Sequence, residues 1–179
     1  YPKCRILIIA ASERQENYLI EKVRESLGKG YKYRSRALKT FLPLKNGTDI
    51  LKYPVGRAGI YVEGLSSVDF LIADEAIHIG QDVWDSILPM LSEPHSRGLG
   101  WVTILSNTKG EPKGYFWECF NNPNFEKVWI SAEDCPHLSK EFLSQEKERL
   151  SDLDYRRIYL GEFVESSYKY FGKEIIDEI

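Results

Sequence analysis

The stretch Val68-Asp69-Phe70-Leu71-Ile72-Ala73-Asp74-Glu75 decides the predicted fold. It contains a short apolar run, and it ends in two adjacent carboxylates. A short apolar run of this kind is typical of a strand that is buried on both faces of a parallel sheet. The sequence therefore predicts a central strand with acidic side chains at its carboxyl end.

Two further apolar runs predict neighbouring strands, one at residues 5–11 and one at residues 101–105. After the first run, Ser12 and Gln15 form a capping-box pattern, which marks the start of a helix. Apolar residues then recur at helical spacing until Gly28, where we expect the helix to end. A second helical stretch is predicted from about residue 81 to residue 91.

A hairpin is expected between the first two strands. Residues 37–44 and 49–55 alternate in the manner of antiparallel strands, and Asn46-Gly47 is a typical turn sequence between them. Farther along, residues 128–130 predict a short strand, and helices are expected at about 139–150 and 152–160. Strands that alternate with helices around one inserted hairpin indicate an α/β domain of three layers with a mainly parallel sheet.

The acidic pair has a chemical interpretation. Four apolar residues followed by Asp74-Glu75 match the Walker B pattern of nucleotide hydrolases. In such a site the aspartate holds Mg²⁺ beside the β- and γ-phosphates, and the adjacent carboxylate orients or deprotonates the attacking water. The alternative is a strand that simply ends in solvent, and the motif alone does not exclude it.

Hydrogen-bonding side chains follow the next predicted strand, at Ser106, Asn107 and Thr108. Loops that leave the carboxyl ends of parallel strands converge on a crevice, where such sheets bind ligands. There these side chains would sense a γ-phosphate and transmit its presence to another part of the protein. The alternative is a local turn role, because Ser, Asn and Thr commonly bond to their own backbone.

Length, composition and net charge limit which classes of protein the chain can belong to. The 179 residues are 42% hydrophobic, enough for one compact domain, and 24 basic against 27 acidic residues give a net charge of −3. That balance argues against a protein wholly devoted to coating nucleic acid. Residues 29–52 nevertheless carry seven basic side chains against the single acid Asp49. This strip either faces phosphates or is an ordinary solvated surface of the hairpin. The second interpretation is slightly favoured, because lysines commonly protect exposed strand edges from unwanted pairing.

The three cysteines, Cys4, Cys119 and Cys135, are widely spaced and are interpreted as reduced thiols. No run approaches the roughly 20 apolar residues that span a bilayer, and the first residues lack a secretory-signal pattern. We therefore expect a cytosolic setting without membrane association.

Taken together, the motifs resemble one family, the large terminase subunits of tailed viruses and related archaeal elements. The similarity covers nearly the whole chain, and the order of its parts is more specific than any single part. Those parts are RILIIAASERQENYLIEKVRE at residues 5–25, the hairpin around Asn46-Gly47, VEGLSSVDFLIADEA at 62–76, ILSNTKGEPKGYFWECF at 104–120 and DYRRIYLGEFVE at 154–165.

The resemblance implies a P-loop NTPase-like ATPase domain that uses ATP and Mg²⁺. By position it assigns Asp74 to the magnesium ion, Glu75 to the attacking water, and Ser106, Asn107 and Thr108 to coupling between hydrolysis and motion. It further implies double-stranded DNA, a portal and a small terminase subunit as partners, assembly as a homo-oligomer, and a location in the host cytoplasm. Residues 1–163 would form the ATPase core, and residues 164–179 would lead toward a nuclease domain.

Two departures from the family pattern limit these expectations. No Gly-x-x-x-x-Gly-Lys-Ser/Thr phosphate loop occurs, since Gly28-Lys29-Gly30 has the wrong spacing and follows a helix. We therefore expect weak or undetectable ATP hydrolysis by this chain alone. Many relatives also carry an arginine where this chain has Glu63; Arg57 is either its substitute near the nucleotide or an exposed loop residue.

Two alternatives remain open at this stage. One is a non-catalytic remnant or truncated protein that keeps the fold and binds DNA or a partner. The other is a fragment of a superfamily-2 helicase, which leaves the DYRRIYLGEF pattern at residues 154–163 unexplained.

Overall fold

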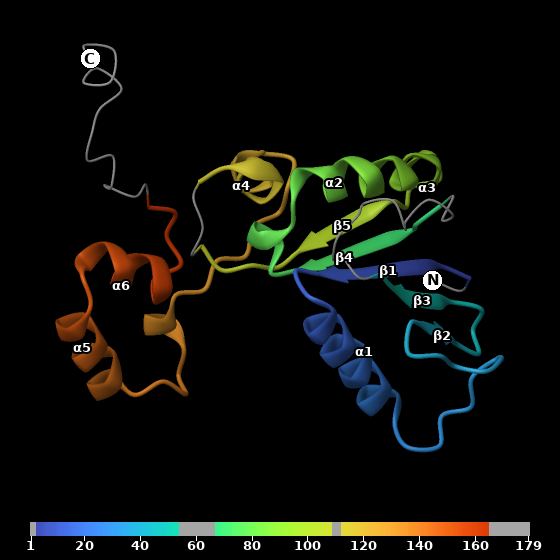
Figure 1. The fold of residues 1–179 in the computed structure, drawn as a ribbon, viewed down its shortest axis with the longest axis horizontal. Helices are drawn as coiled ribbons and strands as arrows, with labels where there is room; N and C mark the ends of the chain where they lie inside the picture. Colours follow the sequence, from blue (N-terminus) through green and yellow to red (C-terminus); the bar gives the residue numbers. More distant parts are fainter. Residues whose placement is uncertain (1–2, 54–66, 109–111, 165–179) are drawn as a thin grey trace, which may run out of the picture. The chain divides into compact units, whose positions relative to one another are not determined.

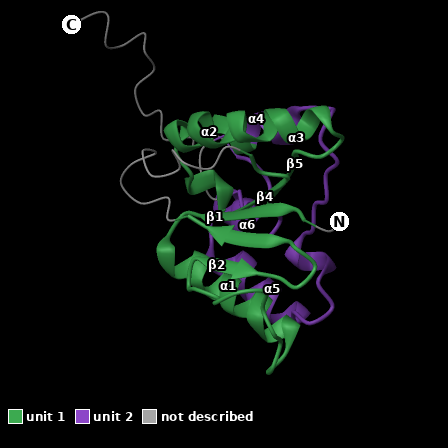
Figure 2. Ribbon diagram, turned by 90° about the vertical axis from the view of Figure 1, so that its right-hand side faces the viewer, with its two compact units in different colours: residues 1–106, 114–116 green, residues 107–113, 117–179 purple. Residues whose placement is uncertain are grey.

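The computed structural model describes residues 3–53, 67–108 and 112–164. The chain divides into two compact units, which Figure 2 shows in different colours. The first unit comprises residues 1–106 with 114–116, and the second comprises residues 107–113 with 117–179. Each unit is described by itself.

The first unit is built on a sheet in the order β2-β3-β1-β4-β5 (Figure 1). Its strands are β1 (Arg5–Ala10), β2 (Phe41–Pro43), β3 (Asp49–Lys52), β4 (Phe70–Asp74) and β5 (Trp101–Ile104). Strands β3, β1, β4 and β5 are parallel, and β2 pairs antiparallel with β3. The predicted mainly parallel sheet with one hairpin is confirmed, and the hairpin is an edge of the sheet itself.

Helices cover both faces of this sheet, which gives the three predicted layers (Figure 1). Helix α1 (Glu13–Leu27) packs on one face. It begins where the Ser12 side chain accepts a hydrogen bond from the Gln15 N–H, and it ends at Gly28, whose φ of 84° favours glycine. The other face carries α2 (Gln81–Ile87), the 3-10 helix η3 (Leu88–Leu91) and α3 (Ser92–Ser96).

The predicted helix at 81–91 is therefore not one regular α-helix. It changes to a 3-10 helix at residue 88, with a proline at the start of η3. Proline lacks the N–H that would continue the α-helical hydrogen-bond ladder, which explains the change. A shorter 3-10 helix, η2 (Ala76–His78), lies between β4 and α2.

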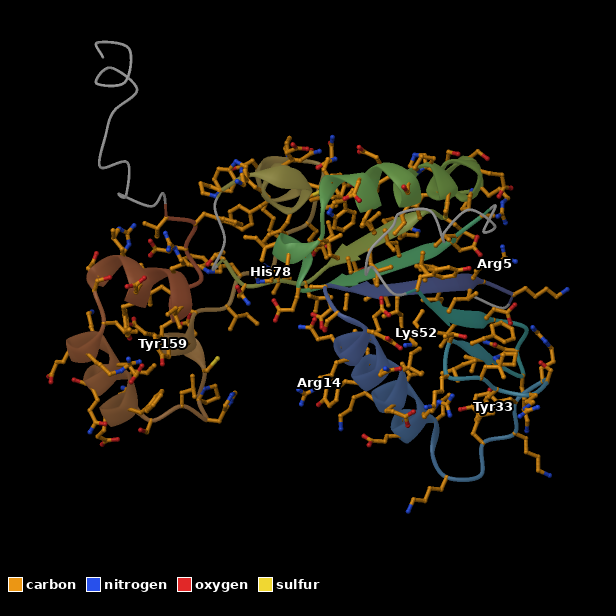
Figure 3. All side chains as sticks on the ribbon, viewed as in Figure 1. Arg5, Arg14, Tyr33, Lys52, His78 and Tyr159 are labelled. Atoms are coloured by element: carbon orange, nitrogen blue, oxygen red, sulfur yellow. The ribbon has the colours of Figure 1, made fainter. Side chains whose placement is uncertain are left out.

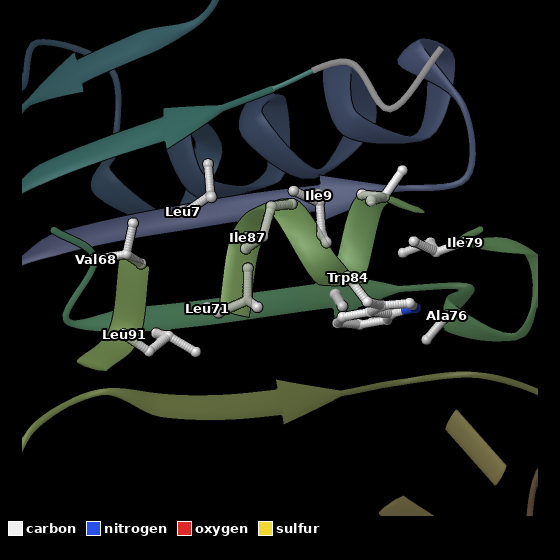
Figure 4. Close-up of a cluster of buried hydrophobic side chains, with 11 residues drawn as sticks. Leu7, Ile9, Val68, Leu71, Ala76, Ile79, Trp84, Ile87 and Leu91 are labelled. Atoms are coloured by element: carbon white, nitrogen blue, oxygen red, sulfur yellow. The ribbon is translucent and has the colours of Figure 1, made fainter. Parts of the chain in front are cut away.

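The main hydrophobic core lies between the sheet and the helices α2 and η3 (Figure 4). Trp84 is 1% exposed, and Leu71 and Ile87 are fully buried. A second apolar cluster on the α1 side contains Ile8, Ile20, Leu42 and Ile50. Because both faces of β1 and β4 are covered, their sequences read as nearly continuous apolar runs.

A buried ion pair joins the hairpin to α1. The ammonium of Lys52 lies 3.9 Å from the Glu16 carboxylate and donates a 2.7 Å hydrogen bond to Asn17 Oδ1. Lys52 is 3% exposed and Glu16 is fully buried (Figure 3 labels Lys52). Lys52 thus does not belong to the exposed basic strip in which the sequence placed it, because its charge is compensated inside the fold.

The second unit contains most of α4 (Gly114–Asn121), together with the 3-10 helix η4 (Ala132–Asp134), α5 (Lys140–Arg149) and α6 (Asp152–Ile158). Ser139 accepts a hydrogen bond from the Phe142 N–H, which confirms the predicted start of α5. The indole of Trp129 donates to the Leu160 carbonyl at 2.9 Å. Hydrogen bonds from Arg149 and then from Tyr159 lower the pKa of Glu146 to about 2.

The prediction of a strand at residues 128–130 is wrong. Val128, Trp129 and Ile130 are 83%, 60% and 66% exposed, and no strand of the described chain pairs with them. A segment with high β propensity forms a strand only when a neighbouring strand supplies hydrogen bonds and side-chain contacts. Pairing, not propensity, therefore decided the conformation here.

The cysteines Cys4, Cys119 and Cys135 are all free thiols, as the sequence indicated. Within the described ranges, no helix has the length and apolar character that crossing a membrane requires.

Leu71→Ala is expected to lower the free energy of unfolding by about 2–5 kcal/mol, because it leaves a cavity at a fully buried position of β4. Urea titration followed by circular dichroism measures this loss. Leu38→Ala is the matched control, since Leu38 is 48% exposed and should change the same quantity by less than about 0.5 kcal/mol. Equal effects of the two substitutions would contradict the placement of the core.

Candidate active site

The carboxyl ends of three parallel strands meet at one edge of the first unit. In the register of the sheet, Ala10 of β1 is opposite Asp74 of β4, and Ala73 of β4 is opposite Ile104 of β5. His78, labelled in Figure 3, follows β4 at this edge. Open parallel sheets bind ligands at such an edge, because the loops leaving the strands converge there.

The acidic pair lies where β4 ends. Asp74 is its last residue, and both Asp74 and Glu75 are half-buried. Glu75 has φ 50° and ψ 43°, which is the left-handed region. Only Lys3 and Glu75 have positive φ among the described residues other than glycine. A residue in this conformation costs about 1–3 kcal/mol and persists only where its surroundings enforce it, as at many functional sites.

Hydrogen bonds from the neighbouring strand hold the turn that contains Glu75. The Ala76 N–H donates to the Leu105 carbonyl at 3.1 Å, and the Ile77 N–H donates to Ser106 Oγ at 3.0 Å. The Leu105 N–H in turn donates to the Ala73 carbonyl at 2.8 Å. The end of β5 is therefore bonded to the chain on both sides of the acidic pair.

The structure thus brings Ser106 next to the turn formed by Asp74 and Glu75, all within the first unit. Asn107 and Thr108 belong to the second unit. Thr108 is 5% exposed and donates its hydroxyl to the Arg157 carbonyl at 3.1 Å, so this hydroxyl supports the interior of that unit. Arg57 and Glu63 lie outside the described residues.

The acidic pair supplies carboxylate oxygens, which are ligands that Mg²⁺ prefers. Among the described residues no group of three or more His, Cys, Asp and Glu side chains lies close enough to bind a metal. Mg²⁺ keeps several waters and commonly binds one or two carboxylates together with substrate phosphates. Asp74 supplies one hard oxygen donor of this kind at the strand end.

Sequence reasoning did not find the backbone part of this site. Two N–H groups, those of Ala76 and Ile77, fix the turn through bonds to Leu105 and Ser106. The left-handed conformation of Glu75 was also missed. Glycine or asparagine usually signals such a conformation, and a glutamate gives no such signal.

Comparison with known proteins gives related sequences. No protein-family model matches the chain. It is 29% identical to the large terminase subunit of Thermus phage G20c and equally to that of Thermus virus P23-45. Each match covers 60% of this chain and 25% of the relative, so the chain corresponds to about a quarter of the length of these relatives.

Solved structures share the fold. The ATPase domain of the large terminase of Thermus phage P74-26 superposes with a TM-score of 0.68 at 22% identity, over 91% of this chain and 78% of that domain. The large terminase of another thermophilic bacteriophage, solved in complex with ADP, gives a TM-score of 0.66 at 14% identity, over 92% of this chain and 41% of that protein.

The fold, with acids and a serine at the carboxyl ends of adjacent parallel strands, is that of the terminase ATPase domain among the solved structures. The sequence relatives and the fold together confirm the resemblance to large terminase subunits that the sequence motifs indicated. The chain thus resembles the core of a large terminase subunit ATPase domain in both sequence and fold.

Ser106→Ala is expected to speed hydrogen exchange at the Ile77 amide, because that N–H loses its partner. The free energy of unfolding should fall by about 0.5–1.5 kcal/mol. Amide exchange measured by NMR tests the first effect, and urea titration tests the second. Ser106→Thr keeps a hydroxyl and should retain the protection; an unchanged Ile77 exchange rate in the alanine variant would argue against the bond.

Glu75→Gly should be more stable than Glu75→Ala by about 1 kcal/mol, because only glycine adopts the left-handed conformation without strain. Both variants lack the carboxylate, so the comparison isolates the backbone. Thermal and urea unfolding measure the difference. An alanine variant at least as stable as the glycine variant would show that position 75 is not strained.

Proposed function

We propose that this chain is the ATPase core of a motor that packages double-stranded DNA into a viral capsid. The observation that carries the proposal is the Glu75 turn, a strained left-handed residue beside Asp74, fixed by hydrogen bonds to the end of β5. Strain at an acidic residue on the carboxyl edge of a parallel sheet supports a catalytic role.

In this proposal the two acids have separate tasks. Mg²⁺, when bound beside the β- and γ-phosphates, supplies positive charge near the transferring phosphoryl group. The Asp74 carboxylate would bind that ion, directly or through water. The Glu75 carboxylate would orient the attacking water and accept its proton.

Ser106 would connect this chemistry to β5. Its hydroxyl oxygen accepts a hydrogen bond from the Ile77 N–H. A shift of the Glu75 turn on loss of the γ-phosphate would therefore move the end of β5. Asn107 and Thr108 follow directly, and the Thr108 hydroxyl is bonded to α6 through Arg157. We infer that the segment 106–108 couples the nucleotide state to movement. In switches of this kind, a contact with the γ-phosphate orders a segment, and loss of that contact releases it.

Solved structures of related proteins support this proposal. Structures of the thermophilic bacteriophage terminase described above include complexes with ADP and with ATP-gamma-S, which supports ATP as the nucleotide of this chain. Because the chain corresponds to 25% of its sequence relatives, packaging of DNA would be the activity of a complete protein. A portal, a small terminase subunit, assembly as a homo-oligomer and a location in the host cytoplasm belong to the same proposal.

Fusion of a phosphate-loop strand from a relative ahead of this chain should give magnesium-dependent ATP hydrolysis. Glu75→Gln should then lower kcat by about 10²–10⁴-fold, because it removes the general base without changing the size of the side chain. Steady-state phosphate release measures this loss.

Asp85→Asn is the matched control, since Asp85 is an exposed acid on α2 and should leave kcat unchanged. Full activity in Glu75→Gln would remove Glu75 from the proposed role. Titration calorimetry of the unfused chain with Mg-ATP addresses the non-catalytic alternative, because micromolar binding would contradict a purely structural protein.

A further inference from the structure

The turn of the hairpin between β2 and β3 contains the dipeptide Asn46-Gly47. Asn46 is exposed, and Gly47 has a φ of 89°. A side chain at position 47 would have to displace Lys3, because a Cβ there would lie 2.9 Å from Lys3 Cγ. Glycine is therefore required at this position, and its missing side chain leaves the backbone nitrogen open to reaction.

A hydrogen bond folds the Asn46 side chain back over the peptide that follows it. Asn46 Oδ1 accepts this bond from the Thr48 N–H at 3.0 Å. A side-chain oxygen that reaches the N–H two residues farther on lies over the intervening peptide, which is the arrangement of an Asx turn. The side-chain carbonyl carbon of Asn46, Cγ, therefore lies beside the Gly47 nitrogen.

This arrangement favours attack by that nitrogen on the side chain. When a nucleophile adds to an amide carbonyl, the carbonyl oxygen becomes negatively charged, and a donor already in place stabilises that charge. Here the oxygen is Asn46 Oδ1, and the donor is the Thr48 N–H. Thr48 is 4% exposed, and its carbonyl accepts a 2.8 Å hydrogen bond from the Leu44 N–H, so the hairpin holds the donor in place.

One hydrogen bond of the turn opposes the reaction. The Gly47 N–H donates to the Leu44 carbonyl at 3.1 Å, and this bond must break before the nitrogen can lose its proton. The turn is the exposed tip of a hairpin, where local opening costs little free energy. The opposing bond therefore slows the reaction without preventing it.

A second asparagine of the chain provides an internal comparison. Asn122 Oδ1 accepts a hydrogen bond from the Asn124 N–H, also at 3.0 Å, so its side chain is folded back in the same way. The residue that follows Asn122 is Pro123, whose nitrogen carries no hydrogen and cannot become the nucleophile. Asn46 and Asn122 thus share a hydrogen-bond geometry and differ in the attacking group.

We propose that Asn46 is a site of spontaneous deamidation. Water or hydroxide takes the proton of the Gly47 N–H, and the nitrogen lone pair forms a bond to Asn46 Cγ. The bond from Cγ to the side-chain nitrogen breaks, and that nitrogen takes up a proton and leaves as ammonia. Water then opens the five-membered succinimide ring. Cleavage at Cγ gives aspartate, and cleavage at the main-chain carbonyl gives isoaspartate, in which the main chain runs through the side chain.

The two products change the hairpin and leave the candidate active site unaltered. Each places a carboxylate in residues 28–48, which otherwise contain no acid. Isoaspartate also adds a methylene to the main chain between β2 and β3. Because Asp49 of β3 pairs with Arg5 at the amino end of β1, the turn lies at the edge of the sheet opposite Asp74. This inference is therefore independent of the proposed function.

The test incubates the folded chain at mildly acidic and at mildly alkaline pH and follows the tryptic peptide 46–52 by mass spectrometry. Aspartate and isoaspartate should accumulate at position 46, faster at the higher pH because the attacking nitrogen must lose its proton. Asn122 should stay intact in the tryptic peptide 114–127. An unmodified Asn46, or equal conversion at Asn122, would overturn the proposal.

Two further comparisons test the part assigned to the turn. A synthetic peptide of residues 42–52 has the same sequence without the fixed Thr48 donor, so the folded chain should deamidate at least as fast as the peptide. A slower reaction in the folded chain would overturn that part. Asn46→Gln keeps an amide but needs a six-membered ring, so it should remain unmodified under the same conditions, and conversion at an equal rate would contradict succinimide formation.

Discussion

The pairing of backbone N–H groups at the end of β4 is the constraint on which the candidate site depends. A chain that leaves a buried strand must satisfy its polar groups at once, because an unpaired buried N–H costs free energy. Here the N–H groups of Ala76 and Ile77 are satisfied by Leu105 and Ser106 at the end of β5. That solution requires β4 and β5 to be parallel neighbours, and it fixes Glu75 in a left-handed conformation.

The strain at Glu75 is sustained by the packing behind it. Trp84, Leu71 and Ile87 lie in the core between the sheet and α2, and Ala76, which follows Glu75, is 1% exposed in the same cluster. Burial of each large apolar side chain contributes roughly 1.5–3 kcal/mol, similar to the cost of one residue in an unfavourable backbone conformation. The rigid sheet therefore supports an acidic turn that would not keep this shape in an isolated peptide.

Charged side chains of the first unit lie in two different environments. Asp74 and Glu75 lie where β4 ends, and the cations Lys29, Lys32 and Lys39 follow the end of α1. Each charge type has a different environment, since the acids are half-buried and fixed whereas the cations are exposed. Buried Lys52 shows the contrast, because its charge is compensated inside the fold by Glu16.

The sequence by itself determined the elements whose signals are local: the apolar strands, the start of α1 at Ser12, its end at Gly28 and the acidic pair after β4. Tertiary structure alone decided the features that depend on contacts between residues distant in the sequence. Residues 128–130 remain outside any described strand because β propensity needs a partner, and Lys52 is buried because Glu16 lies opposite it. Ser106 meets the Glu75 turn because parallel pairing aligns the ends of β4 and β5, which no local pattern encodes.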